Sequence, residues 1–400
     1  MYKQALSTRI SHFGITFDLG SRDEKKDETG LTHLLEHMFF KGTTRRSWRQ
    51  ILNSIEMAGG ELNAFTSKEK TCVYASLMSP QTKMAIDLMA DITLNSVFPE
   101  VELEKEKKVI MDEMDIYADS PEEKILDEFY ERMFPGHNLG ANILGDRTRL
   151  KSFKPQNLRD ILSRFLSPGK MVLSYCGPLE LNKIKAWCEQ AFHLPETRQS
   201  IPQRVFPQSS LPFKNIQKVS NQQCHVVLGN IACSMHDERK TASMLLANML
   251  GGPALNSLLN LSLREKNGLT YGVEAAYNYF SDTGLFYIQW TVDRVNLSKS
   301  LKMVRRALKR IMEKPFSESL LKKYKTQFIG QMIISEESNQ GLMLMMGRTY
   351  LDFGEVEPLE KILAEIEAIT SEQLQNLAKE LFLPDKMSLL VYKPDQKNVS

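Results

Sequence analysis

The pattern of apolar and polar residues divides the first half of the chain into strand and helix candidates. Alternation over residues 13–19 has the period of a half-buried strand, which the charged run at 22–28 ends. Further strands are predicted at 61–66, 71–78 and 171–176. Helical periodicity predicts helices at 31–41, 47–57, 80–95, 100–117, 121–133 and 179–191.

The second half of the chain repeats this order of elements. Strands are predicted at 225–228, 271–279, 284–292 and 387–392. A helix is predicted at 238–250, and long helical patterns run through residues 297–352. The closing strands of the two halves, 171–175 and 387–391, resemble each other. We therefore predict a structural repeat of about 200 residues.

Four prolines separate the two halves. They fall within eighteen residues, at 195, 202, 207 and 212, which is typical of a connection and not of a helix or strand. We predict a first domain at 1–198, a linker at 199–214 and a second domain at 215–400. The expected fold class is α+β, with two structurally repeated domains, each a mostly antiparallel sheet with helices packed on one face.

Composition narrows the range of functions. The chain has 400 residues, of which 42% are hydrophobic and 25% charged, as in globular proteins, and its net charge of +2 does not indicate nucleic acid or an anionic membrane as a partner. None of the five cysteines forms a CxxC pair, which predicts reduced thiols. No apolar run approaches the roughly 18 residues of a membrane span, and no signal peptide opens the chain. A cytoplasmic location is expected, with export left open.

One short motif carries recognisable chemistry, His33-Leu34-Leu35-Glu36-His37. On a helix that advances about 100° per residue, His33, Glu36 and His37 share one face, and the leucines turn to the other. Two imidazoles one turn apart suit a tetrahedral Zn²⁺, and a carboxylate between them can act on metal-bound water. The order His-x-x-Glu-His is the inverted form of a known zinc-peptidase motif.

A catalytic zinc takes a third protein ligand, and the predicted helix 100–117 offers candidates. Glu106 and Glu113 lie seven residues apart, almost two full turns, at the rim of the apolar stripe of this helix. The alternative is that both belong to a solvated face interleaved with Lys105, Lys107 and Lys108. Periodicity alone does not decide between these two interpretations.

Three stretches carry a resemblance to a known family. The sequence resembles the pitrilysin/insulysin family of inverted-motif zinc peptidases, and most of all its bacterial branch of mitochondrial-processing-peptidase-like enzymes. The matching stretches are Gly30 to Thr43, Gly59 to Thr66 and Glu106 to Glu113.

This resemblance implies a zinc metalloendopeptidase that hydrolyses peptides or unfolded, extended protein segments. His33, His37 and Glu113 would bind one Zn²⁺ per chain. Glu36 would take a proton from the zinc-bound water, and Glu106 would orient a ligand from behind.

The resemblance also implies how a substrate is held. The strand of Asn63, Ala64, Phe65 and Thr66 would add the substrate backbone as a further strand. In the second half, Arg264 and Tyr271 match an Arg and a Tyr that contact substrate, seven residues apart.

The family also implies an extra strand before residue 10. Only nine residues precede residue 10, so we expect either that the first sheet lacks this edge strand or that the chain is shortened.

One chain carries both the zinc motif and the Arg/Tyr pair, which favours a self-sufficient enzyme, most simply a homodimer acting on peptides. Two other functions remain open: a non-catalytic partner subunit, and a module that sequesters peptides without cutting them. The second half has no zinc motif of its own. His225 and His236 are expected to be structural or exposed, and His137 to be a loop residue.

Overall fold

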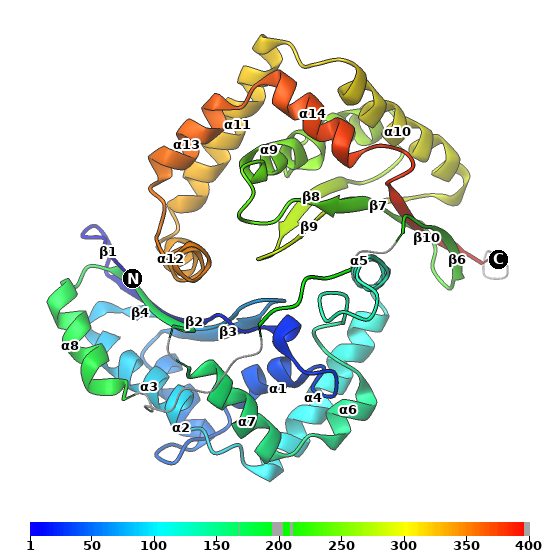
Figure 1. Cartoon of the computed structure of the whole chain (residues 1–400). Coiled ribbons are helices and arrows are strands. Elements are labelled where there is room, and N and C mark those ends of the chain that lie inside the picture. The colour runs from blue at the N-terminus through cyan, green and yellow to red at the C-terminus, as the bar shows by residue number, and fades with distance from the viewer. Residues whose placement is uncertain (168, 194–202, 209–210, 396–400) are drawn as a thin grey trace. The chain divides into compact units, whose positions relative to one another are not determined.

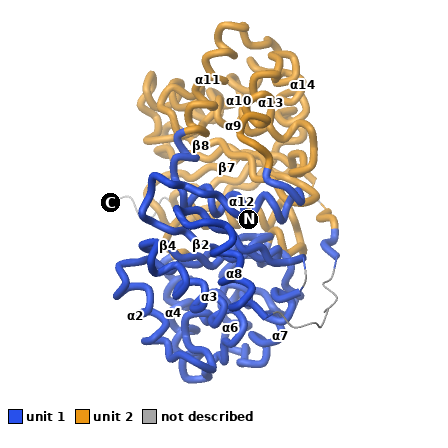
Figure 2. Tube along the Cα trace, turned by 90° about the vertical axis from the view of Figure 1, so that its left-hand side faces the viewer, with its two compact units in different colours: residues 1–116, 141–205, 334–356 blue, residues 117–140, 206–333, 357–400 orange. Residues whose placement is uncertain are grey.

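The computed structural model describes residues 1–167, 169–193, 203–208 and 211–395 (Figure 1). They form two compact units (Figure 2). Unit 1 comprises Met1–Ile116, Ala141–Val205 and Ile334–Val356. Unit 2 comprises Tyr117–Gly140, Phe206–Ile333 and Glu357–Ser400.

Unit 1 contains a five-stranded sheet in the order β1-β5-β2-β4-β3. Its strands are β1 (Tyr2–Gln4), β2 (Ile10–Phe17), β3 (Glu61–Thr66), β4 (Thr71–Met78) and β5 (Met171–Gly177). The β1–β5 pair is parallel, and all other pairs are antiparallel. The expectation of a missing edge strand is wrong, because three residues suffice for β1 to pair with the end of β5, from Tyr2 opposite Tyr175 to Gln4 opposite Gly177.

The core of unit 1 lies between this sheet and a layer of helices. Phe13, Ile15 and Phe17 alternate along β2 and turn fully buried side chains to this layer, as the period-2 pattern predicts. The helices of unit 1 are α1 (Leu31–Met38), α2 (Trp48–Glu56), α3 (Thr82–Leu94), α4 (Glu100–Ala118, which ends in unit 2), α6 (Arg147–Ser152), α7 (Pro155–Phe165), α8 (Leu181–Ala191) and α12 (Asn339–Phe353).

Unit 2 repeats the topology of unit 1, with strand order β6-β10-β7-β9-β8. Its strands are β6 (Lys214–Val219), β7 (Cys224–Ala232), β8 (Val273–Tyr279), β9 (Gly284–Val292) and β10 (Ser388–Pro394), and only the β6–β10 pair is parallel. Its helices are α5 (Pro121–Met133), α9 (Lys240–Gly251), α10 (Leu297–Glu313), α11 (Glu318–Glu336), α13 (Leu359–Ala368) and α14 (Ser371–Leu381), with a π-helical segment, η3 (Asn260–Glu265). The predicted repeat and the α+β fold class are confirmed.

Each sheet is covered on its second face by a helix from the other half of the chain. In unit 1, α12 packs on β2 and β5, on the side opposite α3 and α8 (Figure 1). Helix α12 can approach β2 closely because each has a glycine at the contact, Gly347 in α12 and Gly14 in β2. Met343 of α12 accepts a hydrogen bond from Ser174 of β5 at 3.1 Å. In unit 2, α5 packs on β7 and β10 through Phe129. The sequence pattern predicted helices on one face of each sheet and did not indicate this exchange.

The division into domains at 1–198 and 215–400 stays a prediction. The chain passes from unit 1 to unit 2 between Val205 and Phe206, inside the predicted linker, of which residues 199–202 and 209–210 lie outside the described residues. The exchanged helices make each unit discontinuous along the chain.

The cysteines and the apolar content of the helices were also considered in the sequence. All five cysteines are free thiols, as predicted. Within the described ranges, no helix combines the length and the apolar content that crossing a bilayer requires.

Two helical glycines provide a matched test of the α12 packing. A Cβ at Gly347 would lie 2.6 Å from Thr16 Oγ1, whereas a Cβ at Gly330 in α11 would meet no atom within 4 Å. Helix propensity favours alanine at both positions by roughly 0.5–1 kcal/mol. We expect Gly330→Ala to raise the melting temperature slightly and Gly347→Ala to lower it, because overpacking costs about 1–3 kcal/mol. Scanning calorimetry would measure both, and equal shifts would contradict the packing described for α12.

Candidate metal centre

Helix α1 has an apolar back and a chemical front. Leu31, Leu34, Leu35 and Met38 are fully buried. On the other face, the His33 and His37 side chains keep 14% and 17% of their surface exposed. The sequence therefore sets the rotation of the helix about its axis, and with it the direction of its three polar side chains.

A buried carboxylate holds the N-terminus of α1. Gly30 precedes the helix in the left-handed region (φ 92°), and Glu24 accepts hydrogen bonds from Gly30 N at 3.0 Å and from Thr32 N at 2.7 Å. These are backbone donors that the first turn of a helix leaves unsatisfied. Glu24 was not singled out from the sequence, because its distance from the helix start fits no standard cap.

Three candidate ligands converge in front of α1. Glu113 Oε2, from α4, lies 3.7 Å from His37 Nε2 and 4.0 Å from His33 Nε2. Ligand atoms of all three residues lie within 4.8 Å of one another, and this is the one such group of metal-binding type among the described residues. Ligand atoms about 2.0–2.2 Å from a tetrahedral zinc are separated by roughly 3.3–3.6 Å, so the three residues fit such an ion with little movement.

The charges around the two imidazoles favour a cation between them and Glu113. Burial, together with the neighbouring His37, lowers the pKa of His33 to about 4, so its ring is neutral and keeps a lone pair for a metal. For His37, burial lowers the pKa, but the hydrogen bond with Glu106 and the charges of Glu113 and Glu36 outweigh it and raise the pKa. These carboxylates therefore favour positive charge at the position the three ligands share.

Glu106 fixes the His37 ring from behind. Glu106 Oε2 lies 3.1 Å from His37 Nδ1, and Glu106 Oε1 lies 2.6 Å from Lys41 Nζ. Burial raises the pKa of Glu106, but the hydrogen bonds from His37 and Lys41 outweigh it and lower the pKa. An ionised Glu106 accepts the Nδ1–H of His37, which leaves His37 Nε2 to face Glu113. Lys41 was missed from the sequence, although it lies within the predicted helix 31–41; the helix itself ends at Met38, and Lys41 follows it.

Glu36 lies beside the cluster and contacts the edge strand. Thr66 Oγ1 donates a hydrogen bond to Glu36 Oε2 at 2.5 Å. The pKa of Glu36 is raised, because burial raises it by more than this hydrogen bond and the charge of His37 lower it. A carboxylate with a raised pKa is better suited to accept and return a proton near neutral pH. The sequence singled out Thr66 for its backbone only.

The remaining residues predicted on β3 lie along the edge of the sheet. Asn63, Ala64 and Phe65 pair with β4 on one side, and among the described residues no strand pairs with the other side of β3 (Figure 1). Phe65 is partly buried, with its ring 6.4 Å from that of Tyr74.

Comparison with known proteins agrees with this geometry. Residues 1–147 match the family model described as insulinase (peptidase family M16), and residues 152–328 match the model described as the peptidase M16 inactive domain. A protein of Bacillus subtilis (strain 168), named uncharacterized zinc protease YmxG, is 32% identical over 385 residues, which cover 96% of this chain and 93% of that protein. The chain belongs to peptidase family M16, the insulinase family.

Further M16 relatives and solved structures extend the comparison. An uncharacterized zinc protease of Rickettsia felis is 31% identical over 365 residues, covering 91% of this chain and 88% of the relative. The crystal structure of a protease from Helicobacter pylori matches with a TM-score of 0.91 at 17% identity, over 98% of this chain and 96% of that one. A peptidase M16 inactive domain from Pseudomonas fluorescens matches with a TM-score of 0.88 at 19% identity, over 98% and 95%. The two structures show the shared fold, and family membership identifies the chain as a zinc metallopeptidase.

The other residues singled out from the sequence belong to unit 2. Arg264 is the second-to-last residue of η3 in unit 2, where its Nε lies 3.4 Å from Glu265 Oε1, and Tyr271 is 85% exposed in the loop before β8. His225 is buried in β7, with Nδ1 3.3 Å from Thr291 Oγ1, and His137 accepts a hydrogen bond from Leu139 N between α5 and α6.

The Glu106 contact predicts how strongly this M16 enzyme holds its metal. We expect Glu106→Gln to weaken zinc affinity by roughly 10–100-fold, because a neutral amide does not support the imidazole ligand as a carboxylate does. Competition with a chromophoric chelator would measure the affinity. Glu104→Gln is the matched control on the same helix, since Glu104 pairs with Lys107 at 2.7 Å and is 61% exposed. Equal zinc affinities in the two variants would contradict the role given to Glu106.

Proposed function

We propose that the chain is a zinc metalloendopeptidase that hydrolyses peptides or unfolded, extended protein segments. The observation that carries this proposal is the convergence of His33, His37 and Glu113, with Glu36 beside them and in contact with the edge strand through Thr66. Metal ligands, a proton acceptor and an open strand edge are together sufficient for a metallopeptidase to hold and cleave an extended peptide.

The ligand roles follow from the donor atoms. His33 and His37 would hold one Zn²⁺ per chain through Nε2, and Glu113 through its carboxylate, since these atoms face one another. When bound, zinc supplies Lewis-acid polarisation of the scissile carbonyl and makes a water more acidic. Glu106 and Lys41 would keep the His37 ring in place and in the required tautomer.

Glu36 would accept and return the proton. One of its oxygens accepts the Thr66 hydroxyl hydrogen bond, and the other can receive a proton from the attacking water. The raised pKa of Glu36 allows the same group to hand that proton to the leaving amine. Thr66 would thereby set the orientation of Glu36 relative to the strand.

Substrate would be held by strand addition at β3. The backbone of Asn63, Ala64, Phe65 and Thr66 would pair with the peptide, which gives affinity with little dependence on side-chain sequence. Arg264 would contact a substrate carbonyl, and the Tyr271 hydroxyl would support the tetrahedral intermediate, as the family resemblance implies.

The wider organisation also belongs to this proposal. Residues 1–198 would form the half that binds zinc, and residues 215–400 the half without a metal site. The enzyme would act as a homodimer, which analytical ultracentrifugation would test, and a monomer at all concentrations would contradict it. A cytoplasmic location stays a prediction that cell fractionation would test.

A peptide digest of Glu36→Gln tests the proposal. Zinc content should match that of the unaltered enzyme, because Glu36 is not a ligand, while kcat/KM should fall by roughly 10²–10⁴-fold, the usual contribution of a general base. Mass spectrometry of a diverse peptide library would give cleavage sites and rates, and zinc would be measured on the same samples. The matched control is again Glu104→Gln, which should cleave normally.

The outcomes of this digest separate the alternatives. Full activity in Glu36→Gln would contradict the proton-acceptor role. Absence of bound zinc from the unaltered protein would favour a non-catalytic subunit, and zinc with bound but uncut peptides would favour a sequestering module.

Peptides carrying single backbone N-methyl groups test strand addition in the same digest, because they lose a backbone hydrogen-bond donor while keeping their side chains. Unchanged cleavage across such a series would contradict pairing with β3.

A further inference from the structure

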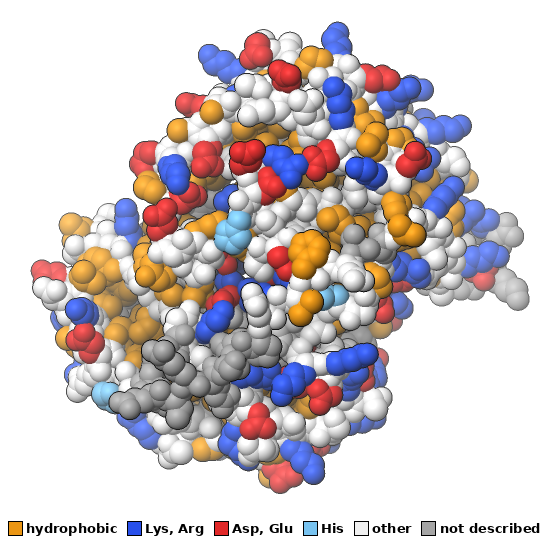
Figure 3. Space-filling view, in the orientation of Figure 1, with side chains coloured by type: hydrophobic (Ala, Val, Ile, Leu, Met, Phe, Trp, Pro, Cys, Tyr) orange, Lys and Arg blue, Asp and Glu red, His pale blue; other side chains and the backbone are white. Residues whose placement is uncertain are grey.

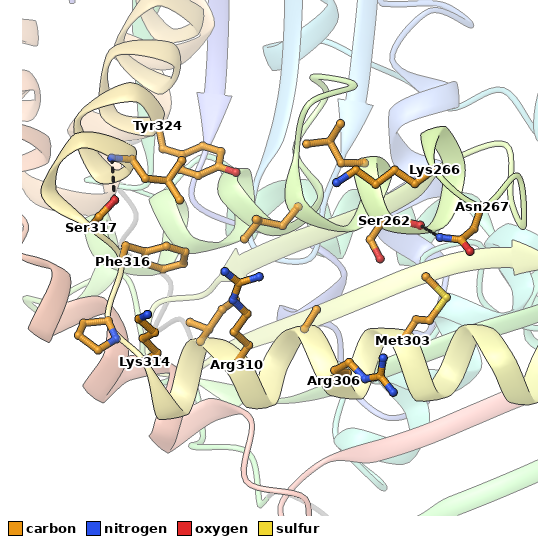
Figure 4. A pocket seen from close by; sticks show the side chains of 16 residues that line it. Ser262, Lys266, Asn267, Met303, Arg306, Arg310, Lys314, Phe316, Ser317 and Tyr324 are labelled. Atoms are coloured by element: carbon orange, nitrogen blue, oxygen red, sulfur yellow. Dashed lines mark hydrogen bonds between the residues drawn. The ribbon is translucent and has the colours of Figure 1, made fainter.

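Unit 2 contains a cleft between the π-helical segment η3, helix α10 and the start of α11 (Figure 4). Its volume is about 660 Å³, within the range of small-molecule sites, which runs from roughly 300 to 1,000 Å³. None of the candidate metal-binding, catalytic or substrate-contacting residues named above lines it. The cleft lies within residues 258–324 and is complete inside this unit.

One wall of the cleft carries a row of positive charges. Arg306, Arg310 and Lys314 follow one another at four-residue spacing along and just beyond α10, so they lie on one side of the helix. Figure 4 shows the Arg310 side chain pointing from α10 into the cleft. Lys266, which follows η3, lines the opposite wall. A ligand in the cleft would therefore meet cationic groups from two sides.

These charges have no acidic counterpart in the part of the chain that the structure describes. Among those residues, none that lines the cleft is acidic, and no carboxylate lies within 4.0 Å of the charged groups of Arg306, Arg310, Lys314 or Lys266. The acids nearest in sequence are engaged elsewhere, as Glu313 pairs with Lys309 at 3.4 Å and Glu265 pairs with Arg264 at 3.4 Å. The cleft thus keeps an uncompensated positive charge next to its walls.

The surrounding surface has the same sign. Lysine and arginine recur along α10, and they gather over the position of this helix in Figure 3. The basic residues of α10 are Lys299, Lys302, Arg305, Arg306, Lys309 and Arg310, against Glu313 as its one acid. Such a surface attracts anions from a distance.

Most of the remaining lining is apolar, and Ser262, Asn267 and Ser317 are its uncharged polar residues. Leu258, Leu261, Met303, Ala307, Ile311, Pro315, Phe316, Leu320 and Tyr324 form most of the cleft surface. A free inorganic anion would leave this surface in contact with water, and an uncharged apolar molecule would leave the cations unused. The lining is therefore complementary to a ligand that has both an apolar part and an anionic part.

We propose that this cleft binds an anionic amphiphile, a molecule with an apolar chain or ring that ends in a carboxylate or phosphate. The apolar part lies against Met303, Ile311 and Tyr324, and the anionic end meets the guanidinium groups of Arg306 and Arg310. Arginine is suited to this contact because its planar fork binds carboxylate or phosphate through two parallel hydrogen bonds. The ligand class does not depend on the peptidase activity proposed above.

The ligand test uses the full-length enzyme and a fluorescent fatty carboxylate whose emission rises when it leaves water. Four competitors are titrated: dodecanoate and dodecyl phosphate below their critical micelle concentrations, dodecanol below its solubility limit, and inorganic phosphate. We expect the first two to displace the probe and the last two to fail at the same concentrations. Comparing dodecanoate with dodecyl phosphate distinguishes a carboxylate from a phosphate ligand. Equal displacement by dodecanol, displacement by inorganic phosphate, or displacement by an acidic peptide but by neither amphiphile would overturn the proposal.

Variants locate the site on the chain. Removing both guanidinium groups with Arg306→Ala/Arg310→Ala should weaken probe binding by about tenfold or more, the loss expected for charge-assisted hydrogen bonds. Arg305→Ala is the matched control, because Arg305 is an exposed arginine of the same helix that does not line the cleft. Ala307→Glu should abolish binding by placing an acid in the lining. Circular dichroism would verify that each variant is folded. Equal losses in the Arg305→Ala control, or unchanged binding in the double variant and Ala307→Glu, would contradict the assignment.

Discussion

The arrangement of the three candidate metal ligands depends on the burial of one face of an eight-residue helix. An isolated helix of this length is unstable in water, so α1 exists because Leu31, Leu34, Leu35 and Met38 are enclosed by the core of unit 1. Burying each such side chain stabilises the fold by roughly 1.5–3 kcal/mol. Rotation of α1 about its axis would expose these residues, so the same burial fixes where His33, Glu36 and His37 point. The chemistry on the front of the helix is positioned by packing at its back.

The cluster also needs a carboxylate from α4, a helix that begins 62 residues after the end of α1. Leu103 and Ile110 anchor α4 in the same core, and this places Glu106 and Glu113 on the side that faces α1. Like-signed carboxylates would repel one another there without compensation. His37 and Lys41 neutralise Glu106, and the positive charge of a bound cation would do the same for Glu113 and Glu36. A cation among these side chains would balance their negative charge.

The spacing of apolar residues along the chain predicted the helices and strands that bury one face. The helices that carry His33 and Glu113 and the strand that ends at Thr66 were placed within a few residues, because each has a buried stripe with a clear period. The choice between a solvated and a functional face for Glu106 could not be made from spacing, since it depends on what packs against α4. The exchange of α5 and α12 was also out of reach, because a helix that covers a sheet of the other half shows the same amphipathic pattern as one that does not. Lys41 and the Thr66 hydroxyl acquire their roles through contacts between elements, which no single pattern encodes. The cationic cleft of unit 2 likewise arises from residues of η3, α10 and α11 that only the fold brings together.

X-ray diffraction from crystals of the purified enzyme, recorded on both sides of the zinc absorption edge, tests the central claim most directly. An anomalous difference map locates zinc without any assumption about activity. We expect one strong peak per chain, bounded by His33 Nε2, His37 Nε2 and the Glu113 carboxylate, with Glu106 still hydrogen-bonded to His37 Nδ1. A fully occupied zinc bound by other residues, with these three side chains left apart, would contradict it.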